Sequence, residues 1–230
     1  MTTQLTTTKP PAPAEPARWW QPWLNGAYVL IGAMTAGWAV GWLGIHVAHD
    51  TQPLWLLARI SGLAAMILLT GLVSLGLLLA HPRGTVLRSI NRRTLLSIHI
   101  GLAAFTAVFI VLHVVVLATD KYAGVGWAGV FLPLGASYRP IPVTLGWLAL
   151  YSGLAAGITA RFAGRLGRVW WPIHRVAIVV YAAAWLHGLL AGSDSAALIL
   201  TYAGSLLLVL SFAASRYLTD PIRKLPRGVR

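Results

Sequence analysis

The amino-acid sequence predicts an all-α integral membrane protein, a bundle of six transmembrane helices with both termini in the cytoplasm. Of its 230 residues, 57% are hydrophobic and only 10% are charged, whereas about a quarter of the residues in a typical soluble domain are charged. The charges are also segregated, because six long stretches contain no Asp, Glu, Lys or Arg. These stretches are residues 19–49, 60–82, 94–119, 140–160, 176–193 and 195–215. Each is close to the roughly 20 residues that an α-helix needs to cross a bilayer.

The distribution of basic residues predicts the orientation. The chain carries a formal net charge of +13, and most of its Lys and Arg lie in the two tails or in the gaps after the second and fourth spans. Cytoplasmic segments of membrane proteins carry an excess of Lys and Arg, so we expect both termini in the cytoplasm of a multi-pass protein of the plasma or inner membrane. We therefore interpret the basic excess as a topology signal and expect membrane lipid, not nucleic acid, as the partner.

The sequence divides into one membrane domain and two tails. Residues 1–24 are rich in Thr and Pro and predict a disordered cytoplasmic tail. Residues 25–216 form the transmembrane domain, and residues 217–230 form a basic cytoplasmic tail. The expected helices are residues 26–47, 53–80, 93–118, 142–162, 170–191 and 195–216. The connection 119–141 is the one long loop, and its apolar composition predicts that it folds back over the outer mouth of the bundle.

Four histidines within the spans are the candidate metal ligands. The chain has seven histidines and no cysteine, which excludes iron–sulfur clusters and thiolate-ligated haem. His99 and His113 lie in the third span and His174 and His187 in the fifth, with the spacings H-x13-H and H-x12-H. An ionisable side chain at membrane depth is costly and is usually functional.

The spacing of these histidines predicts two haem sites. Both spans run in the same direction, so His99 and His174 are expected at one depth near the inner face, and His113 and His187 at another near the outer face. Fourteen residues of α-helix rise about 21 Å. This separation suits two haem planes stacked across a bilayer, each iron bound by one histidine from either helix.

Other interpretations of the histidines stay open. One is neutral imidazoles that hydrogen-bond to neighbouring helices. Another is a histidine-lined proton-coupled transporter or channel without haem, and a third is a scaffold subunit with one haem or none. Ideal geometry also places His174 and His187 about 140° apart around their helix. The fifth helix therefore needs a locally tightened turn, or its two haems are approached from different azimuths.

With these histidine motifs, the chain resembles the ferric reductase-like transmembrane family. That family includes the membrane cores of NADPH oxidases and ferric reductases, and the bacterial haem subunit that serves the periplasmic methionine sulfoxide reductase. The segments WLLARISG (55–62), LGASYRPI (134–141) and HGLLAGSDS (187–195) also resemble its bacterial members. The likeness covers about residues 25–216.

The resemblance implies a role for each membrane histidine. His99 and His174 would bind the inner of two b-type haems, and His113 and His187 the outer one. Arg59 matches the arginine of the family's second helix, which lies near a haem propionate. Its expected position, about six residues or 9 Å below the outer surface, is close to the depth of the outer pair. The alternative is an arginine that extends to the interface.

Further residues are candidates by position alone. Three arginines near the inner face are candidate propionate partners, although positive-inside anchoring explains them equally well. Three aromatic residues between the two histidine levels are candidates to line the gap between the haems, with simple packing as the alternative. The arginines are Arg92, Arg93 and Arg175, and the aromatic residues are Phe105, Phe109 and Tyr181.

At the outer face, His46 and His49 with Asp50 are a candidate metal or acceptor site or are simply interfacial residues. Ser137, Tyr138 and Arg139 are a candidate contact for the electron acceptor. His81 is assigned no role.

Two stacked haems predict the passage of single electrons across the membrane, from the cytoplasm outward. Eukaryotic members of the family continue into flavin and nicotinamide domains, but the residues after the sixth span carry no G-x-G-x-x-G fingerprint. We therefore expect a separate cytoplasmic reductase or a quinol as the donor, with a flavin or quinone as a further cofactor that is not evident in the sequence. The expected acceptor is an extracytoplasmic protein, a ferric chelate or oxygen. Whether this oxidoreductase component is itself an enzyme stays open.

Overall fold

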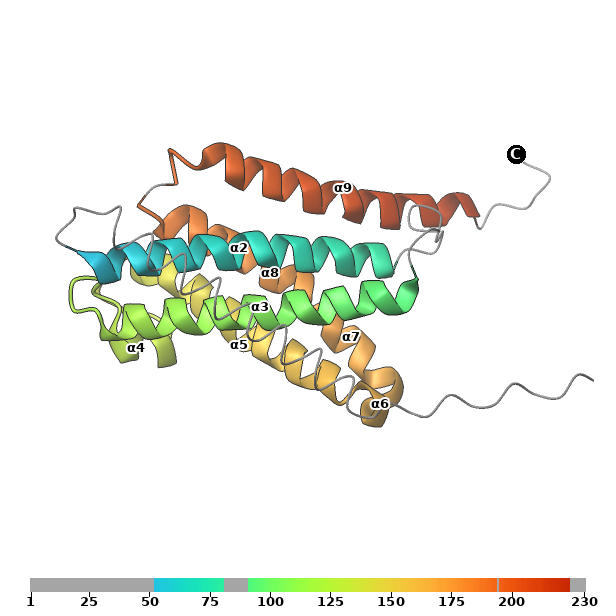
Figure 1. The fold of residues 1–230 in the computed structure, drawn as a ribbon, viewed down its shortest axis with the longest axis horizontal. Coiled ribbons are helices and arrows are strands. Elements are labelled where there is room, and N and C mark those ends of the chain that lie inside the picture. Colours follow the sequence, from blue (N-terminus) through green and yellow to red (C-terminus); the bar gives the residue numbers. More distant parts are fainter. Residues whose placement is uncertain (1–51, 81–90, 194, 224–230) are drawn as a thin grey trace, which may run out of the picture.

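The computed structural model describes residues 52–80, 91–193 and 195–223, and every regular element in these ranges is a helix (Figure 1). The elements are α2 (Pro53–Leu79), α3 (Arg92–Thr119), α4 (Gly126–Phe131), α5 (Pro140–Arg161), α6 (Ala163–Leu166), the 3-10 helix η1 (Gly167–Val169), α7 (Trp170–Arg175), α8 (Ala177–Ala191) and α9 (Ile199–Arg223). The predicted all-α class is confirmed for the described residues. The predicted helix 26–47 lies outside them, as do the N-terminal tail, residues 224–230, and His46, His49, Asp50 and His81.

Five helical segments in the described part of the chain are long and apolar enough to cross a membrane. Four of them are α2, α3, α5 and α9, and the fifth is the interrupted segment Ala163–Ala191, which contains α6 to α8. The predicted boundaries of the second, third and fourth spans agree with the structure to within two residues. The sixth span begins at Ile199, four residues later than expected.

Local sequence signals explain where the spans begin. Pro53 and Pro140 stand at the first turn of α2 and α5, where the missing N–H has no intrahelical partner to lose. The side chain of Asn91 caps α3 by accepting a hydrogen bond of 2.9 Å from the N–H of Arg93. Several hydroxyls within the spans donate to a carbonyl of their own helix, as Thr70 does to Met66 at 2.8 Å. The hydroxyls of Ser74 and Tyr181 are buried without a hydrogen-bond partner among the described residues.

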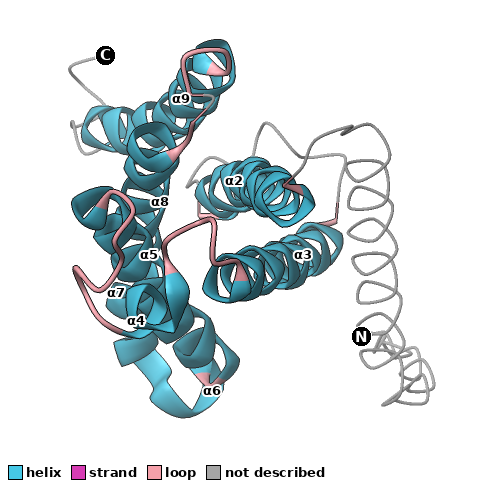
Figure 2. Cartoon of the chain, turned by 90° about the vertical axis from the view of Figure 1, so that its left-hand side faces the viewer, coloured by secondary structure: helices cyan, strands magenta, loops and turns pink. Residues whose placement is uncertain are grey.

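The spans form two tight pairs. α2 packs against α3, and α5 packs against α8, whereas α3 and α8 make no substantial backbone contact. Figure 2 shows the two pairs side by side, with α9 beyond the end of the α5 and α8 layer. α2 contacts both α8 and α9 and so joins the two pairs. The arrangement sets His99 and His113 of α3 opposite His174 of α7 and His187 of α8.

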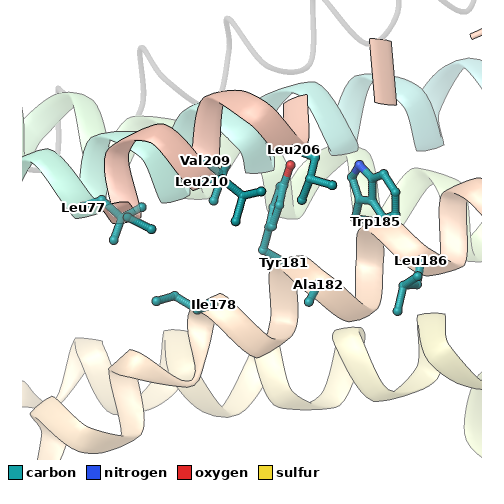
Figure 3. Close-up of a pocket in the computed structure, with 10 residues that line it drawn as sticks. Leu77, Ile178, Tyr181, Ala182, Trp185, Leu186, Leu206, Val209 and Leu210 are labelled. Atoms are coloured by element: carbon teal, nitrogen blue, oxygen red, sulfur yellow. The ribbon is translucent and has the colours of Figure 1, made fainter. Parts of the chain in front are cut away.

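A hydrophobic core lies where α2, α8 and α9 meet. Its buried members are Met66, Leu69, Val73, Leu77, Tyr181 and Val209. An apolar cavity of about 160 Å³ lies beside it between α8 and α9 (Figure 3). Tyr181 belongs to this core and is 2% exposed. Of the two roles considered for it, it has the one of packing in the core.

The connection between α3 and α5 folds back over one end of the bundle. The Tyr138 hydroxyl donates a hydrogen bond of 2.8 Å to the carbonyl of Ala191, and the Arg139 guanidinium donates one of 2.7 Å to the carbonyl of Leu190. These are carbonyls of the last turn of α8, which have no intrahelical partner. Trp55 of α2 lies edge-on to Tyr138, with ring centroids 5.7 Å apart. The connection therefore ties together the ends of α2, α5 and α8.

The same connection contains the string GVGWAG at 124–129, whose glycine spacing matches a dinucleotide-binding fingerprint. That fingerprint functions only between a strand and a helix. Here a turn precedes the short helix α4, and no strand occurs in the described residues. Gly124 and Gly126 have φ of 62° and 60°, a backbone conformation that glycine adopts without strain. The glycines therefore shape the turn.

We expect Tyr138→Phe to destabilise the fold by about 1 kcal/mol, the typical value of one hydrogen bond. The variant keeps the contact with Trp55 but loses the bond to Ala191. Tyr122→Phe is the matched control, because Tyr122 also lies edge-on to Trp55, at 5.9 Å, without bonding to α8. Denaturation of the purified protein in detergent measures the difference, and equal stability of the two variants would contradict the proposed tie.

Candidate functional site

The structure brings the four membrane histidines together in two pairs. The ring centroids of His99 and His174 are 6.3 Å apart, with an angle of 71° between the ring planes. Those of His113 and His187 are also 6.3 Å apart, at 79°. Because α3 runs without interruption from Arg92 to Thr119, the two pairs are about 21 Å apart along it.

The separation of the rings fits a metal between them. An imidazole nitrogen binds a first-row metal ion at about 2.0–2.1 Å and lies about 1.1 Å from its ring centroid, so two imidazoles on opposite sides of one ion have centroids about 6.2–6.4 Å apart. Both observed values, 6.3 Å, fall in this range. Edge-to-face packing of rings spans a wider range of about 4.5–7 Å. That both pairs have the same separation, within the narrower range, therefore favours a site for one metal between the two rings of each pair.

Backbone carbonyls orient the rings of His113 and His187. Nδ1 of His113 donates to the carbonyl of Ala58 at 2.7 Å, and Nδ1 of His187 donates to the carbonyl of Pro142 at 2.8 Å. A carbonyl can only accept, so Nδ1 carries the hydrogen in both rings. The lone pair of Nε2 is then available to a metal, the arrangement usual for histidine ligands.

Glycines on the neighbouring helices make these approaches possible. A Cβ atom at Gly62 would lie 2.8 Å from Cε1 of His113, and one at Gly146 would lie 2.8 Å from Cε1 of His187. Each glycine stands four residues after the carbonyl that accepts the Nδ1 hydrogen bond. A side chain there would cover that carbonyl, so glycine both admits the ring and exposes the acceptor.

The other pair has a looser setting. A Cβ at Gly76 would lie 3.2 Å from Cε1 of His99. The Nδ1 atoms of His99 and His174 are buried without a hydrogen-bond partner in the part of the chain that the structure describes. The ring of Trp170 lies 5.3 Å from that of His174. The two pairs thus share their ring separation but differ in how Nδ1 is held.

A break in the fifth span accommodates the H-x12-H spacing. His174 lies on α7 and His187 on α8, and the helix is interrupted between them at Val176. The N–H of Val176 bonds to the carbonyl of Ile173 at 3.1 Å, three residues back. Such a bond belongs to a 3-10 turn, which is wound more tightly than an α-helix. Of the two expected solutions, the structure contains the tightened turn.

Arg59 lies beside the His113 pair. It follows Ala58, the residue whose carbonyl bonds to His113, and its side chain is half-buried. Arg59 therefore lies at the depth of His113 along the bundle, as the sequence predicted.

The remaining candidates are more dispersed. Arg92, Arg93 and Arg175 are exposed, and Arg175 adjoins His174 in sequence. Phe109 is buried, and Phe105 is half-buried on α3 between the two levels. Tyr138 and Arg139 bond to the end of α8, and the Ser137 hydroxyl bonds to the carbonyl of Gly124 at 2.8 Å. Ser137 therefore stabilises the connection itself, and Tyr138 and Arg139 attach it to α8.

The number of ligands at each pair bears on the kind of metal. Within the described ranges, no group of three or more His, Cys, Asp or Glu could hold a metal ion. A bare ion at either pair would therefore have two protein ligands there, whereas zinc sites use three or four. A haem iron already has its porphyrin nitrogens and needs only axial ligands. The two histidine pairs fit that requirement, and Nε2 of His113 and of His187 is available because their Nδ1 hydrogens are bonded to carbonyls.

Comparisons with known proteins do not assign a family. No family model matches the chain, and neither do any curated protein or solved structure. The resemblance to ferric reductase-like proteins therefore rests on the histidine motifs and the short segments described above.

Proposed function

We propose that this chain is a ferric reductase-like electron-transfer protein that carries two b-type haems across a membrane. His99 and His174 would hold one haem, and His113 and His187 the other. The observation that carries the proposal is the 6.3 Å separation found in both histidine pairs. It leaves the space that one metal needs between two imidazoles.

The protein's own groups would bind and orient the cofactors. The Nδ1 hydrogen bonds to the carbonyls of Ala58 and Pro142 hold the rings of His113 and His187 and leave Nε2 as their metal-binding atom. His113 and His187 would together hold one haem and His99 and His174 the other, and ligation by two histidines would favour electron transfer over oxygen binding. Arg59, at the level of His113, is the candidate partner for a propionate of the haem held by His113 and His187. When bound, haem supplies one-electron redox chemistry.

The proposed topology has six spans, with residues 26–47 as the first and both termini in the cytoplasm of the plasma or inner membrane. The His99 pair would then lie near the cytoplasmic face and the His113 pair near the outer face. The proposed donor is a separate cytoplasmic reductase or a quinol. The proposed acceptor is an extracytoplasmic protein, a ferric chelate or oxygen. The basic residues between spans support this orientation.

A proton relay fits the structure less well than electron transfer. A relay across about 21 Å needs a chain of polar groups between the two histidine pairs. Thr106 donates to the carbonyl of Leu102 at 2.7 Å and Thr70 to that of Met66 at 2.8 Å, and the buried hydroxyls of Ser74 and Tyr181 have no hydrogen-bond partner among the described residues. These hydroxyls therefore form no connected chain. Electron transfer needs no such chain.

Electron transfer across vesicles tests the proposal. We expect full-length, haem-replete protein in sealed vesicles to pass electrons from an impermeant external reductant to ferricyanide trapped inside. His99→Ala should abolish the transfer, because electrons would then have to cross the membrane with one of two carriers missing. Vesicles without protein give the leak rate. Transfer no faster than this leak would reject the proposed function.

A further inference from the structure

The surface of the connection between α3 and α5 is apolar where a water-facing loop would be polar. Residues 122–138 contain no Asp, Glu, Lys or Arg. Four large apolar side chains there are at least half exposed: Trp127 (50%), Phe131 (59%), Leu132 (59%) and Leu134 (63%). Trp127 and Phe131 are stacked, with ring centroids 6.0 Å apart. A patch of this kind marks a contact with lipid or with another protein.

The patch lies beside α5 and does not project beyond its end. The indole Nε1 of Trp147 donates a hydrogen bond of 3.3 Å to the carbonyl of Phe131. The N–H of Leu134 donates one of 2.9 Å to the hydroxyl of Thr144. Thr144 and Trp147 stand four and seven residues after Pro140, so both lie within about the first 10 Å of α5. The 22 residues of α5 extend about 33 Å, little more than the hydrocarbon core. Phe131 and Leu134 therefore lie at the depth of the span.

Several polar backbone groups of this segment are bonded within the protein. A loop at membrane depth is tolerated only if its N–H and carbonyl groups find protein partners. Besides the two bonds to α5, the N–H of Leu132 bonds to the carbonyl of Ala128 at 2.8 Å, and that of Gly135 bonds to the carbonyl of Leu132 at 3.2 Å. Thr144 and Trp147 thus supply the partners that a lipid environment cannot.

The exposed side chains continue the lipid-facing surface of α5. Ile141, in the first turn of α5, is 71% exposed, and Leu148 is 41% exposed on the same helix. At a membrane surface, tryptophan occupies the boundary between headgroups and acyl chains, and phenylalanine and leucine extend below it. A docking site for a soluble protein would be expected to have a polar rim, and residues 122–138 provide no charge for one.

We propose that the segment Trp127–Leu134 is inserted into the membrane interface and that Trp127, Phe131, Leu132 and Leu134 contact lipid. The segment forms a wedge beside α5 and leaves the residues that follow it, Tyr138 and Arg139, to cover the end of α8. This inference is independent of the haem proposal, because it depends on the loop and on α5 alone.

Spin labels on single cysteines test the insertion, because the chain has no cysteine of its own. The full-length protein carrying Leu132→Cys is labelled with a nitroxide and reconstituted into phosphatidylcholine vesicles. We expect the label to collide with oxygen, which concentrates in lipid, several times more often relative to a water-soluble nickel chelate than a label at Lys121→Cys. Leu148→Cys is the lipid-facing control on α5, and Lys121 is exposed and charged. Trp127→Cys gives a second reading from a different turn.

Each result decides the proposal. Labels at 132 and 127 that resemble the label at 148 support insertion. Labels as accessible to nickel as the one at 121 would place the segment in water and overturn the proposal. Labels shielded from both oxygen and nickel would place it against protein, either a second copy or another chain, and would overturn it equally.

Discussion

Replacing His113 or His187 with alanine is expected to remove one haem and leave the other in place. The two histidines face each other at 6.3 Å, and one imidazole alone would hold its haem weakly. The second pair is about 21 Å away along α3, so its ligands are not disturbed. Haem quantitation should fall from about two per chain to about one. His99→Ala and His174→Ala should remove the other haem, with a different loss in the reduced-minus-oxidised spectrum.

The control for this series is His81→Ala, since His81 is not one of the four membrane histidines. It should keep both haems and the parent spectrum. The pairing itself is tested by comparing variants: His113→Ala and His187→Ala should give the same residual spectrum. Two different residual spectra would show that these histidines serve different haems and would contradict the pairing.

Gly146→Ala is expected to empty the site of His187, although it adds only one methyl group. The new Cβ would lie 2.8 Å from both Cε1 and Nδ1 of His187, and the ring would have to give up its bond to Pro142. Overpacking of this kind costs about 1–3 kcal/mol. The displaced ring can no longer meet the metal opposite His113. Gly62→Ala should act in the same way on His113, at 2.8 Å from its Cε1.

Gly157→Ala is the matched control, because it lies in the same helix and has no atom within 4 Å of the new Cβ. Alanine is favoured over glycine in a helix by about 1 kcal/mol, so helix propensity alone would stabilise both variants. Haem content and denaturation in detergent measure the two together. Equal haem content in Gly146→Ala and Gly157→Ala would show that the glycine beside His187 has no role in the site.

The spans and the histidine pairing could be predicted because each depends only on the positions of residues along the sequence. A charge-free run of about 20 residues has few alternatives to a membrane helix. Equal spacing of histidines on two parallel helices also predicts which rings meet, and His99 lies opposite His174 as His113 does opposite His187. In both cases the prediction required only the rise per residue of an α-helix.

The glycines beside the histidines were missed, although the sequence contains a signal for them. Gly62 and Gly76 of α2 are separated by the same fourteen residues as His99 and His113 of α3. In an antiparallel pair this equality places one glycine opposite each histidine, Gly76 at His99 and Gly62 at His113. Spacing within a single helix does not show this relation. It becomes visible only when two helices are aligned.

The break at Val176 and the fold of the outer connection could not be predicted in detail. The position of a tightened turn depends on tertiary contacts, and no proline or glycine stands at Val176 to indicate it. The connection required contacts between residues distant in sequence, such as Leu134 with Thr144 and Tyr138 with Ala191. The left-handed backbone of Leu134 and Arg139, with φ of 61° and 38°, is also unusual for these residue types. Long-range bonds stabilise these conformations, and local sequence does not encode them.

The measurement that tests the central claim most directly is the haem content and redox spectrum of the purified full-length chain. The protein is produced in haem-replete cells, and its haem is extracted and quantified against protein. We predict about two non-covalent b-type haems per chain and a reduced-minus-oxidised spectrum typical of low-spin iron with two histidine ligands. A folded protein that is purified from haem-replete cells and contains no haem would contradict the account, because the four histidines would then be paired for some other purpose.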